Sequence, residues 1–211
     1  MRRLPIYILI DTSGSMRGEP IEAVRVGLDA LATSLRRDPF ALETVWLSVI
    51  TYDREAKVVV PLTELGDFTV PILSTPETSP TNLGEGLELL FSRYRLEVKR
   101  STSTEKGDWL PMLVIMTDGA PSDTLLFKQN VAMLKSYKFA RIICCAAGPK
   151  AKVEPLKQIP DAAIYSLDTL DSSSFSKFWS WVSASVGAQS QRSSDSLGEL
   201  PPPPDEIQLV F

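Results

Sequence analysis

The sequence predicts an α/β protein with a doubly wound architecture: a central, mainly parallel β-sheet with one antiparallel edge strand and helices on both faces. Apolar runs of strand length alternate along the chain with longer segments whose apolar residues recur at helical spacing. Two of these runs, residues 6–10 and 110–117, are almost continuously apolar, which is typical of strands buried on both faces of a parallel sheet. Both lead into an aspartate, Asp11 and Asp118. Ligands bind at the carboxyl ends of strands in such sheets, so the pattern also predicts a site there.

In the first half of the chain, local composition predicts a strand, a helix and a hairpin. Pro20 is placed where the first turn of a helix is expected, and apolar residues follow it at helical spacing. Two β-branched and aromatic runs flank Asp53, which we interpret as part of a hairpin turn, with the second run as the antiparallel edge strand. A loop with three prolines then leads to Thr81. The predicted elements are a strand over 6–10, a helix over 19–37, strands over 45–52 and 56–62, and a loop over 67–80.

The second half continues the alternation of helices and strands. Leu83, Leu87 and Leu90 share one face of a long helix. The last helix is expected to begin near Asp171 or Ser172, whose side chains suit a helix N-cap. The predicted elements are helices over 82–100, 122–136, 151–158 and 172–186, a loop over 101–108, and strands over 110–117, 140–147 and 164–167.

The composition predicts one domain, residues 1–187, followed by a tail, residues 188–211. The tail is rich in Ser and Gln, then contains four consecutive prolines, and ends in a short apolar peptide. Ile207, Leu209 and Phe211 alternate as they would in a strand. Two interpretations stay open: the peptide adds to a sheet edge or enters a groove on another molecule, or it is a disordered terminus.

Charge and residue usage exclude several classes of function. The 22 basic residues are outnumbered by 26 acidic ones, giving a net charge of −4, so there is no general basis for binding nucleic acid. The basic cluster within residues 93–100 is interpreted as the solvated face of a helix. The chain has no histidine and only two cysteines, the adjacent Cys144 and Cys145, which excludes a zinc site built from these ligands and a His-dependent catalytic triad. No apolar run is long enough for a membrane span or a signal-peptide core, so we expect a cytoplasmic protein.

The residues after the first strand have the chemistry of a metal site. Asp11, Ser13 and Ser15 alternate, so in an extended chain their oxygens point to one side. Gly14 is expected to allow a tight turn between the two serines. Oxygen ligands of this kind suit a hard divalent cation such as Mg²⁺. The simpler alternative is a hydrogen-bonded turn that caps the following helix.

The combination of Asp11-Thr12-Ser13-Gly14-Ser15 with Thr81 and Thr117-Asp118-Gly119 resembles the metal-ion-dependent adhesion site (MIDAS) of the von Willebrand factor A (VWA) family. The resemblance covers residues 4–187 and implies the Rossmann-like, doubly wound VWA fold. It implies that Ser13 and Ser15 bind Mg²⁺ directly, with Mn²⁺ or Ca²⁺ as alternatives, and that Thr81 binds it directly or through water. Asp11 and Asp118 would act mainly through hydrogen bonds to these groups. An Asp or Glu side chain of a protein partner would complete the coordination. The residues that this resemblance implies for the metal are Asp11, Ser13, Ser15, Thr81 and Asp118.

Within the VWA family, residues 2–21, 79–84 and 116–121 resemble the TerY-type proteins of bacterial tellurium-resistance gene clusters. This resemblance implies a cytoplasmic scaffold or signalling component of a stress response. Its implied partners are a PP2C-type phosphatase, a Ser/Thr kinase and TerD-like proteins.

Three functional hypotheses follow. The first is a non-enzymatic, metal-dependent protein interaction module. The second is a phosphohydrolase similar to the haloacid dehalogenases, with Asp11 as the nucleophile; it is disfavoured because Ser13 stands where those enzymes carry a second aspartate. The third is a structural subunit whose metal site serves only folding.

Overall fold

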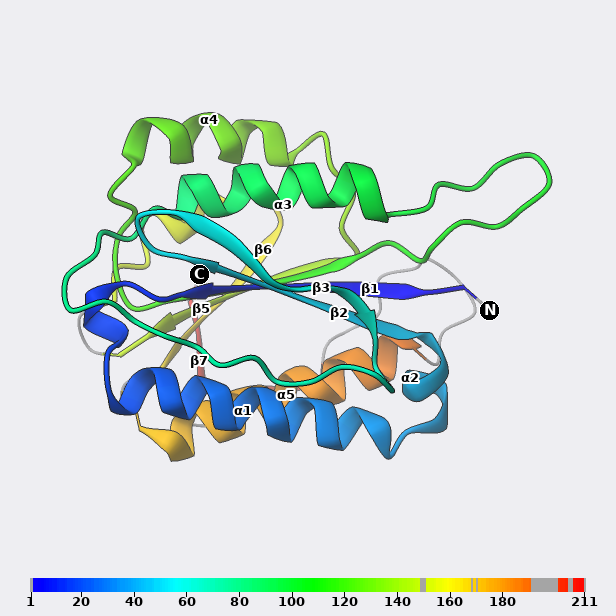
Figure 1. Cartoon of the computed structure of the whole chain (residues 1–211), viewed down its shortest axis with the longest axis horizontal. Helices are drawn as coiled ribbons and strands as arrows, with labels where there is room; N and C mark the ends of the chain where they lie inside the picture. The colour runs from blue at the N-terminus through cyan, green and yellow to red at the C-terminus, as the bar shows by residue number, and fades with distance from the viewer. Residues whose placement is uncertain are drawn as a thin grey trace.

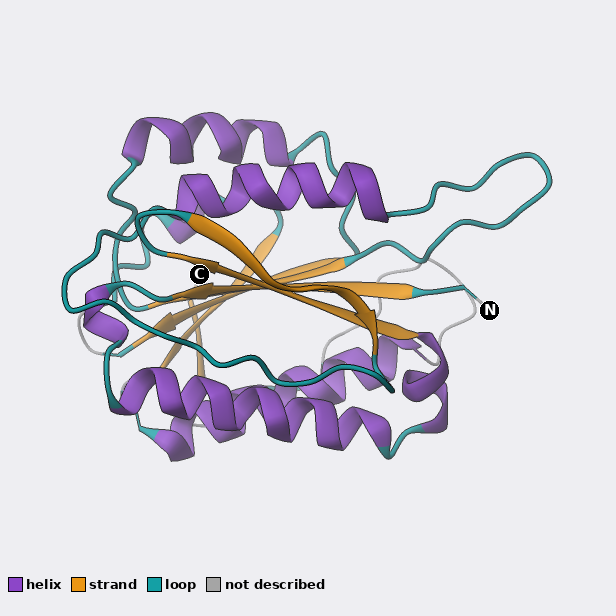
Figure 2. Cartoon of the chain, viewed as in Figure 1, coloured by secondary structure: helices purple, strands orange, loops and turns teal. Residues whose placement is uncertain are grey.

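A seven-stranded β-sheet forms the centre of the part of the chain that this computed structural model describes, which comprises residues 2–148, 151–167, 169, 171–190, 201–204 and 207–210. The strand order is β3-β2-β1-β4-β5-β6-β7, and helices cover both faces (Figures 1 and 2). The inner five strands are mutually parallel, and β3 and β7 are antiparallel to their neighbours. The strands are β1 (Leu4–Asp11), β2 (Val45–Tyr52), β3 (Ala56–Glu64), β4 (Met112–Thr117), β5 (Arg141–Ala147), β6 (Ala162–Leu167) and β7 (Ile207–Val210).

The predicted doubly wound α/β fold is confirmed. The predicted antiparallel edge strand, the second strand of the hairpin, is β3, but the sheet has a second antiparallel edge strand, β7, where only one was predicted. The chain leaves β1 to form β2 on one side and later returns to place β4 on the other side. The strand order therefore switches between β1 and β4. Their carboxyl ends lie side by side at this point, which is where doubly wound sheets bind ligands.

Two helical layers enclose the sheet. In Figure 1, α3 and α4 lie above the sheet, while α1, α2 and α5 lie below it. None of the helices in the described part combines the length and the apolar character that a membrane span needs. The helices are α1 (Glu19–Arg36), α2 (Pro39–Thr44), α3 (Leu83–Glu97), α4 (Thr124–Leu134) and α5 (Ser172–Ser190), with 3-10 turns at Gly14–Met16 and Leu156–Gln158.

Two of the helical segments differ from the prediction. The helix expected over 151–158 is only the 3-10 turn Leu156–Gln158. The short helix α2 was not predicted, although it begins with a recognisable signal: Asp38 accepts a hydrogen bond from the backbone N–H of Phe40, at 2.9 Å, and Pro39 occupies the first turn.

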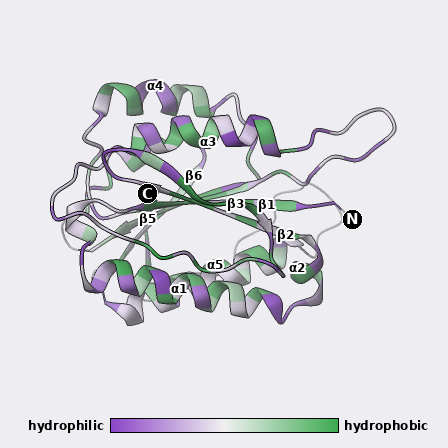
Figure 3. Cartoon of the chain, viewed as in Figure 1, coloured by the Kyte–Doolittle hydropathy of each residue, from purple (hydrophilic) through white to green (hydrophobic). Residues whose placement is uncertain are grey.

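The core lies on both sides of the sheet because the central strands β1, β4 and β5 are apolar at nearly every position. Leu4, Ile6, Ile8 and Ile10 of β1 pack toward α1 and α5, whereas Tyr7 and Leu9 pack toward α3 and α4. Figure 3 shows the same division, with hydrophobic strands and helices that alternate between hydrophobic and hydrophilic residues. Alternation also separates the two cysteines, which are buried and unbridged in opposite core clusters.

The C-terminal peptide forms the second edge of this sheet. β7 pairs antiparallel with β6, and Ile207 is 3% exposed and joins the core. The indole N–H of Trp181 donates to the carbonyl oxygen of Pro201 at 2.8 Å, which fixes the proline segment against α5. The terminal peptide therefore adds to a sheet edge, which was one of the interpretations left open for the tail. The edge is that of its own sheet and not that of another molecule. α5 extends beyond the predicted domain boundary at 187, while residues 191–200 and Phe211 lie outside the described part.

Candidate metal site

The candidate site is formed where β1 and β4 end next to each other. Ile10 is paired with Met116 in the parallel ladder, so the residues that follow these two positions emerge together. Asp11 is completely buried and Asp118 is 8% exposed. The strand order thus brings together two carboxylates that are more than a hundred positions apart in the sequence.

Asp11 orients the turn that follows β1. One carboxylate oxygen, Oδ1, accepts the backbone N–H of Ser13 at 2.8 Å. The other, Oδ2, accepts the hydroxyl of Thr117 at 2.7 Å. Because both oxygens are engaged with the protein, Asp11 fixes the position of Ser13 and ties the ends of β1 and β4 together.

Three further side chains form a continuous chain of hydrogen bonds. The hydroxyls of Ser13 and Ser15 are 3.1 Å apart. Ser15 donates to Oδ1 of Asp118 at 2.8 Å. Ser13 is buried, whereas Ser15 is exposed, so the chain leads from the interior to the surface. The structure therefore brings four of the five predicted residues into one network.

Thr81, the fifth predicted residue, lies beside this network. Its hydroxyl oxygen is 3.5 Å from the position that a Cβ atom on Gly119 would occupy, and Thr81 is 8% exposed. Its backbone is held by Ser122: the Thr81 N–H donates to the Ser122 hydroxyl at 3.1 Å, and the Thr81 carbonyl accepts the Ser122 N–H at 2.8 Å. The hydroxyl of Thr81 thus stays available while its position is fixed.

The site holds negative charge that no basic side chain compensates. Within the described residues, no Lys or Arg forms an ion pair with Asp11 or Asp118. Burial raises the pKa of Asp11 to about 6, although hydrogen bonds from Ser13 and Thr117 oppose the change. Burial also raises the pKa of Asp118, and the hydrogen bond from Ser15 opposes it. A bound cation would offset the cost of burying these carboxylates.

The donor set fits a hard divalent cation. It consists of two carboxylates and the hydroxyls of Ser13, Ser15 and Thr81, all of them oxygen ligands. The described part of the chain has no cluster of three or more His, Cys, Asp or Glu side chains that could hold a metal. Any metal at this site would therefore depend on hydroxyls, water and an external ligand as well as on the carboxylates.

Some residues that shape the site were assigned no role, or a different one, from the sequence. Thr117 was noted only as part of a motif, yet it holds Asp11 and also accepts the N–H of Gly119 at 3.2 Å. Ser122 was not singled out; its position shortly after Asp118 was the available signal. Gly14 has no positive φ angle. Glycine is required there because a Cβ atom would lie 2.9 Å from the carbonyl oxygen of Glu77. The reason for the glycine is therefore the close approach of another loop, and not the tight turn that we expected.

The hairpin turn at Asp53 is confirmed, and it also supports the site. Oδ1 of Asp53 accepts the backbone N–H of Glu55 at 3.2 Å, as in a turn stabilised by an aspartate side chain. Oδ2 accepts the hydroxyl of Thr12 at 3.3 Å, and the Asp53 carbonyl accepts the N–H of Asn82 at 3.0 Å. The hairpin therefore connects the segment after β1 to the segment that carries Thr81.

Comparison with solved structures shows that the chain has a known fold. A von Willebrand factor type A protein from Catenulispora acidiphila is 16% identical, with a TM-score of 0.66 over 88% of this chain and 43% of that one. A D319A mutant of the PilB minor pilin from Streptococcus sanguinis is 11% identical, with a TM-score of 0.69 over 90% and 62%. Proximal thread matrix protein 1 from the mussel byssus, with zinc in its MIDAS motif, is 17% identical, with a TM-score of 0.58 over 90% and 46%. This chain spans less than two thirds of the length of each, and at these identities the likeness concerns the fold.

Comparisons at the level of sequence give one family. A search of curated protein sequences gives no match. The family model for the von Willebrand factor type A domain matches residues 6–177, which is most of the chain and includes every residue of the candidate site. The chain therefore belongs to the von Willebrand factor A family.

Proposed function

We propose that this protein is a non-enzymatic interaction module in which Asp11, Ser13, Ser15, Thr81 and Asp118 hold Mg²⁺, or alternatively Mn²⁺ or Ca²⁺. The observation that carries the proposal is the pair of buried carboxylates that, within the described part of the chain, are bonded only to hydroxyl and N–H groups and not to a basic side chain. When bound, the cation supplies the missing positive charge and a position at which a carboxylate oxygen of a partner replaces water.

The residues of the site divide this task between them. Asp11 and Thr117 hold the Ser13 backbone in place, and Asp118 orients the hydroxyl of Ser15. The serine hydroxyls and that of Thr81 are neutral, so a cation bound through them keeps much of its charge. A site of this kind favours an anionic partner group, such as an Asp or Glu side chain.

The burial of Asp11 argues against the phosphohydrolase hypothesis. A nucleophilic carboxylate has to reach a substrate phosphorus atom, but Asp11 is completely buried and both of its oxygens accept hydrogen bonds from the protein. We therefore propose no catalytic role for it.

We further propose that the protein acts as a TerY-type scaffold in a bacterial tellurium-resistance or stress response in the cytoplasm. The sequence similarity over residues 2–21, 79–84 and 116–121 supports this proposal. The candidate partners are a PP2C-type phosphatase, a Ser/Thr kinase and TerD-like proteins, each of which would present an acidic residue to the site.

Capture of these candidate partners tests the proposal. The immobilised protein is mixed with each purified partner in Mg²⁺ and in EDTA. We expect capture in Mg²⁺, loss of capture in EDTA, and loss of capture by Asp118→Ala in both conditions. Asp29→Ala, which removes an exposed carboxylate from α1, serves as the control and should bind like the wild type. Capture that is equal in Mg²⁺ and EDTA, and unchanged in Asp118→Ala, would contradict a metal-dependent mechanism of binding for these partners.

A further inference from the structure

A basic groove lies at the end of the sheet opposite the metal site. Two adjoining hollows of about 840 Å³ and about 590 Å³ share Leu110, Tyr137 and Lys138. They extend along the residues that precede β4, β5 and β6, between the end of α3 and the segment that follows α4. We call these hollows the basic groove, after the cations that line them: Arg2, Arg95, Lys99, Arg100, Lys135, Lys138 and Arg141.

The positive charge of the basic groove is largely open to a ligand. Lys99, Arg100, Lys135 and Lys138 are exposed, and across the described residues none of them forms an ion pair. Of the acidic residues that the structure describes, two, Asp108 and Asp161, line the groove. The Asp108 side chain is 3% exposed and paired with Arg3, which leaves Asp161 as the open carboxylate. In a protein with a net charge of −4, this is a local reversal of charge.

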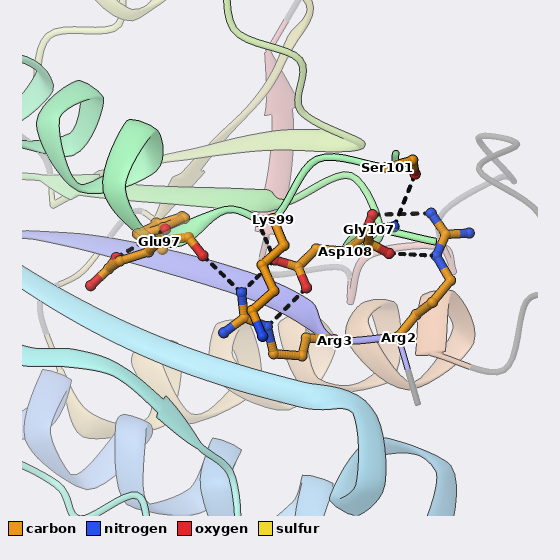
Figure 4. Close-up of polar contacts among 8 residues, drawn as sticks. Arg2, Arg3, Glu97, Lys99, Ser101, Gly107 and Asp108 are labelled. Carbon is orange, nitrogen blue, oxygen red and sulfur yellow. Dashed lines mark hydrogen bonds and ion pairs between the residues drawn. The ribbon is translucent and has the colours of Figure 1, made fainter. Parts of the chain in front are cut away.

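One wall of the basic groove is held rigidly by the residues drawn in Figure 4. Asp108 accepts the backbone N–H of Lys99 at 2.8 Å, and its own N–H donates to the Lys99 carbonyl at 2.9 Å. Arg2 donates to the carbonyl oxygens of Gly107, at 2.9 Å, and Asp108, at 3.0 Å. A glycine is needed at position 107 for the two segments to approach this closely, because a Cβ atom there would lie 2.4 Å from the Lys99 carbonyl oxygen.

The opposite wall is fixed by aromatic side chains. Tyr137 stacks on Phe91 with ring centroids 4.4 Å apart, and its hydroxyl accepts a hydrogen bond from Arg95 at 2.6 Å. The Tyr94 hydroxyl donates to the Lys138 carbonyl at 3.0 Å. The backbones that carry Lys99 and Lys138 are thus ordered before any ligand arrives, which reduces the entropy cost of binding.

The aromatic rings of the groove have faces that other side chains cover, and this favours a peptide over single-stranded nucleic acid as the ligand. Base-stacking proteins present open ring faces in a basic groove. Here one face of Tyr137 is covered by Phe91, and the guanidinium of Arg2 lies 3.6 Å from the ring centroid of Trp109. The rings therefore stabilise the walls, and recognition depends on charge.

The types of open cation favour several separate anionic groups over one tightly held phosphate. An arginine fork grips the two oxygens of a single phosphate or carboxylate through paired N–H groups, whereas a lysine acts as a point charge. The guanidinium of Arg95 already donates to Tyr137 and Ser92, and that of Arg2 to backbone carbonyls. The open charges are Lys99, Arg100, Lys135 and Lys138. Three of the four are lysines, which act as separate point charges and suit carboxylates spread along a peptide.

We propose that the basic groove is a second, metal-independent docking site, for a Glu/Asp-rich segment of a protein partner. The sequence interpretation of residues 93–100 as a solvated helix face did not include the cations that α4 and β5 bring to the same place. Because this site and the metal site lie at opposite ends of the sheet, the protein can hold two partners at once. This inference does not depend on the metal site.

Fluorescence anisotropy with a labelled oligo-glutamate peptide tests the inference on the full chain. We expect binding in EDTA that weakens with added salt, and a loss of affinity of about tenfold or more in the double variant Lys99→Glu/Lys138→Glu. The control is Lys57→Glu/Lys128→Glu, which changes the net charge equally at exposed positions outside the groove and should bind nearly as the wild type does. Arg100→Ser/Lys135→Ser removes charge without reversing it, and should weaken binding by a smaller factor.

Several outcomes would overturn the inference. An equal loss in the groove and control variants would indicate unspecific attraction. Tighter binding of labelled oligothymidine than of the peptide would indicate a nucleic-acid surface, and much tighter binding of a phosphoserine peptide of equal charge would indicate phosphate recognition. Binding that disappears in EDTA would assign the peptide to the metal site. Circular dichroism of each variant confirms that the fold is retained.

Discussion

The two ends of β1 both lie beside a pair of carboxylates, but the charges are balanced differently. At the amino end, Arg3 binds Asp108 through two hydrogen bonds of 2.6 and 2.8 Å (Figure 4). Glu97 is bonded to Arg93 and to the Tyr7 hydroxyl. At the carboxyl end, Asp11 and Asp118 have only hydroxyl and N–H partners among the described residues. The chain thus supplies its own cations at one end, and we propose that a cation from solution takes that place at the other.

The largest expected change in the free energy of unfolding is at the amino end of β1, and it should not depend on metal. Asp108→Ala removes the partner of Arg3, whose side chain is 17% exposed, and leaves a largely buried charge uncompensated. We expect a loss of about 3 kcal/mol in the free energy of unfolding, the same in Mg²⁺ and in EDTA. Urea denaturation measures it, and Asp29→Ala should change the value by less than about 0.5 kcal/mol. If Asp108→Ala also lost less than about 0.5 kcal/mol, Asp108 would not be neutralising a buried charge on Arg3.

The next effect concerns the carboxyl end. If Mg²⁺ binds only the folded protein, a free concentration of about 100 times its dissociation constant raises the free energy of unfolding by about 2.7 kcal/mol. We expect this increase in the wild type and in Asp108→Ala, but not in Asp118→Ala. The same denaturation experiment with and without Mg²⁺ measures it. An undiminished increase in Asp118→Ala would place the cation elsewhere.

A smaller effect is expected for the residue that orients Asp11. Thr117→Val removes the 2.7 Å hydrogen bond to Asp11. We expect a loss of about 1 kcal/mol in metal-free protein and a decrease of about tenfold in Mg²⁺ affinity. Thr63→Val, at a residue of β3 whose hydroxyl bonds only to the nearby Pro61 carbonyl, is the control and should alter neither value. Unchanged Mg²⁺ affinity in Thr117→Val would mean that Asp11 needs no such support.

The smallest effect is a contrast between two equivalent substitutions. In EDTA, Asp118→Asn removes a charge that has no cationic partner among the residues described, and the amide oxygen can still accept the Ser15 hydroxyl. We expect a change of less than about 1 kcal/mol in the free energy of unfolding. Asp108→Asn removes a charge that neutralises Arg3 and should be clearly more destabilising. Equal losses in the two variants would show that the ends of β1 do not differ in charge balance.

The parts of this molecule that the sequence predicted are those governed by local patterns. Continuous apolar runs predicted the parallel strands, and helical spacing predicted α1 and α3 within a few residues. The position of Asp11 and Asp118 after two such runs predicted that they would meet, because parallel strands of one sheet end at the same edge.

The features that were missed depend on contacts between distant segments. Gly14 is required by the loop that contains Glu77. The alternation within β7 was visible in the sequence, but its pairing with β6 of the same chain was not. The basic groove combines cations from both sides of β4, and no local run of sequence reveals that combination. α2 is the exception, since its cap and proline were visible in the sequence.

Calorimetric titration of the metal-free protein with Mg²⁺ measures directly whether a cation binds at the carboxyl end of β1. We expect one binding event per chain in the wild type and in Asp29→Ala, and its loss in Asp118→Ala. Binding of Mg²⁺ to Asp118→Ala with wild-type affinity and stoichiometry would contradict the claim that the carboxyl end of β1 is completed by a cation from solution.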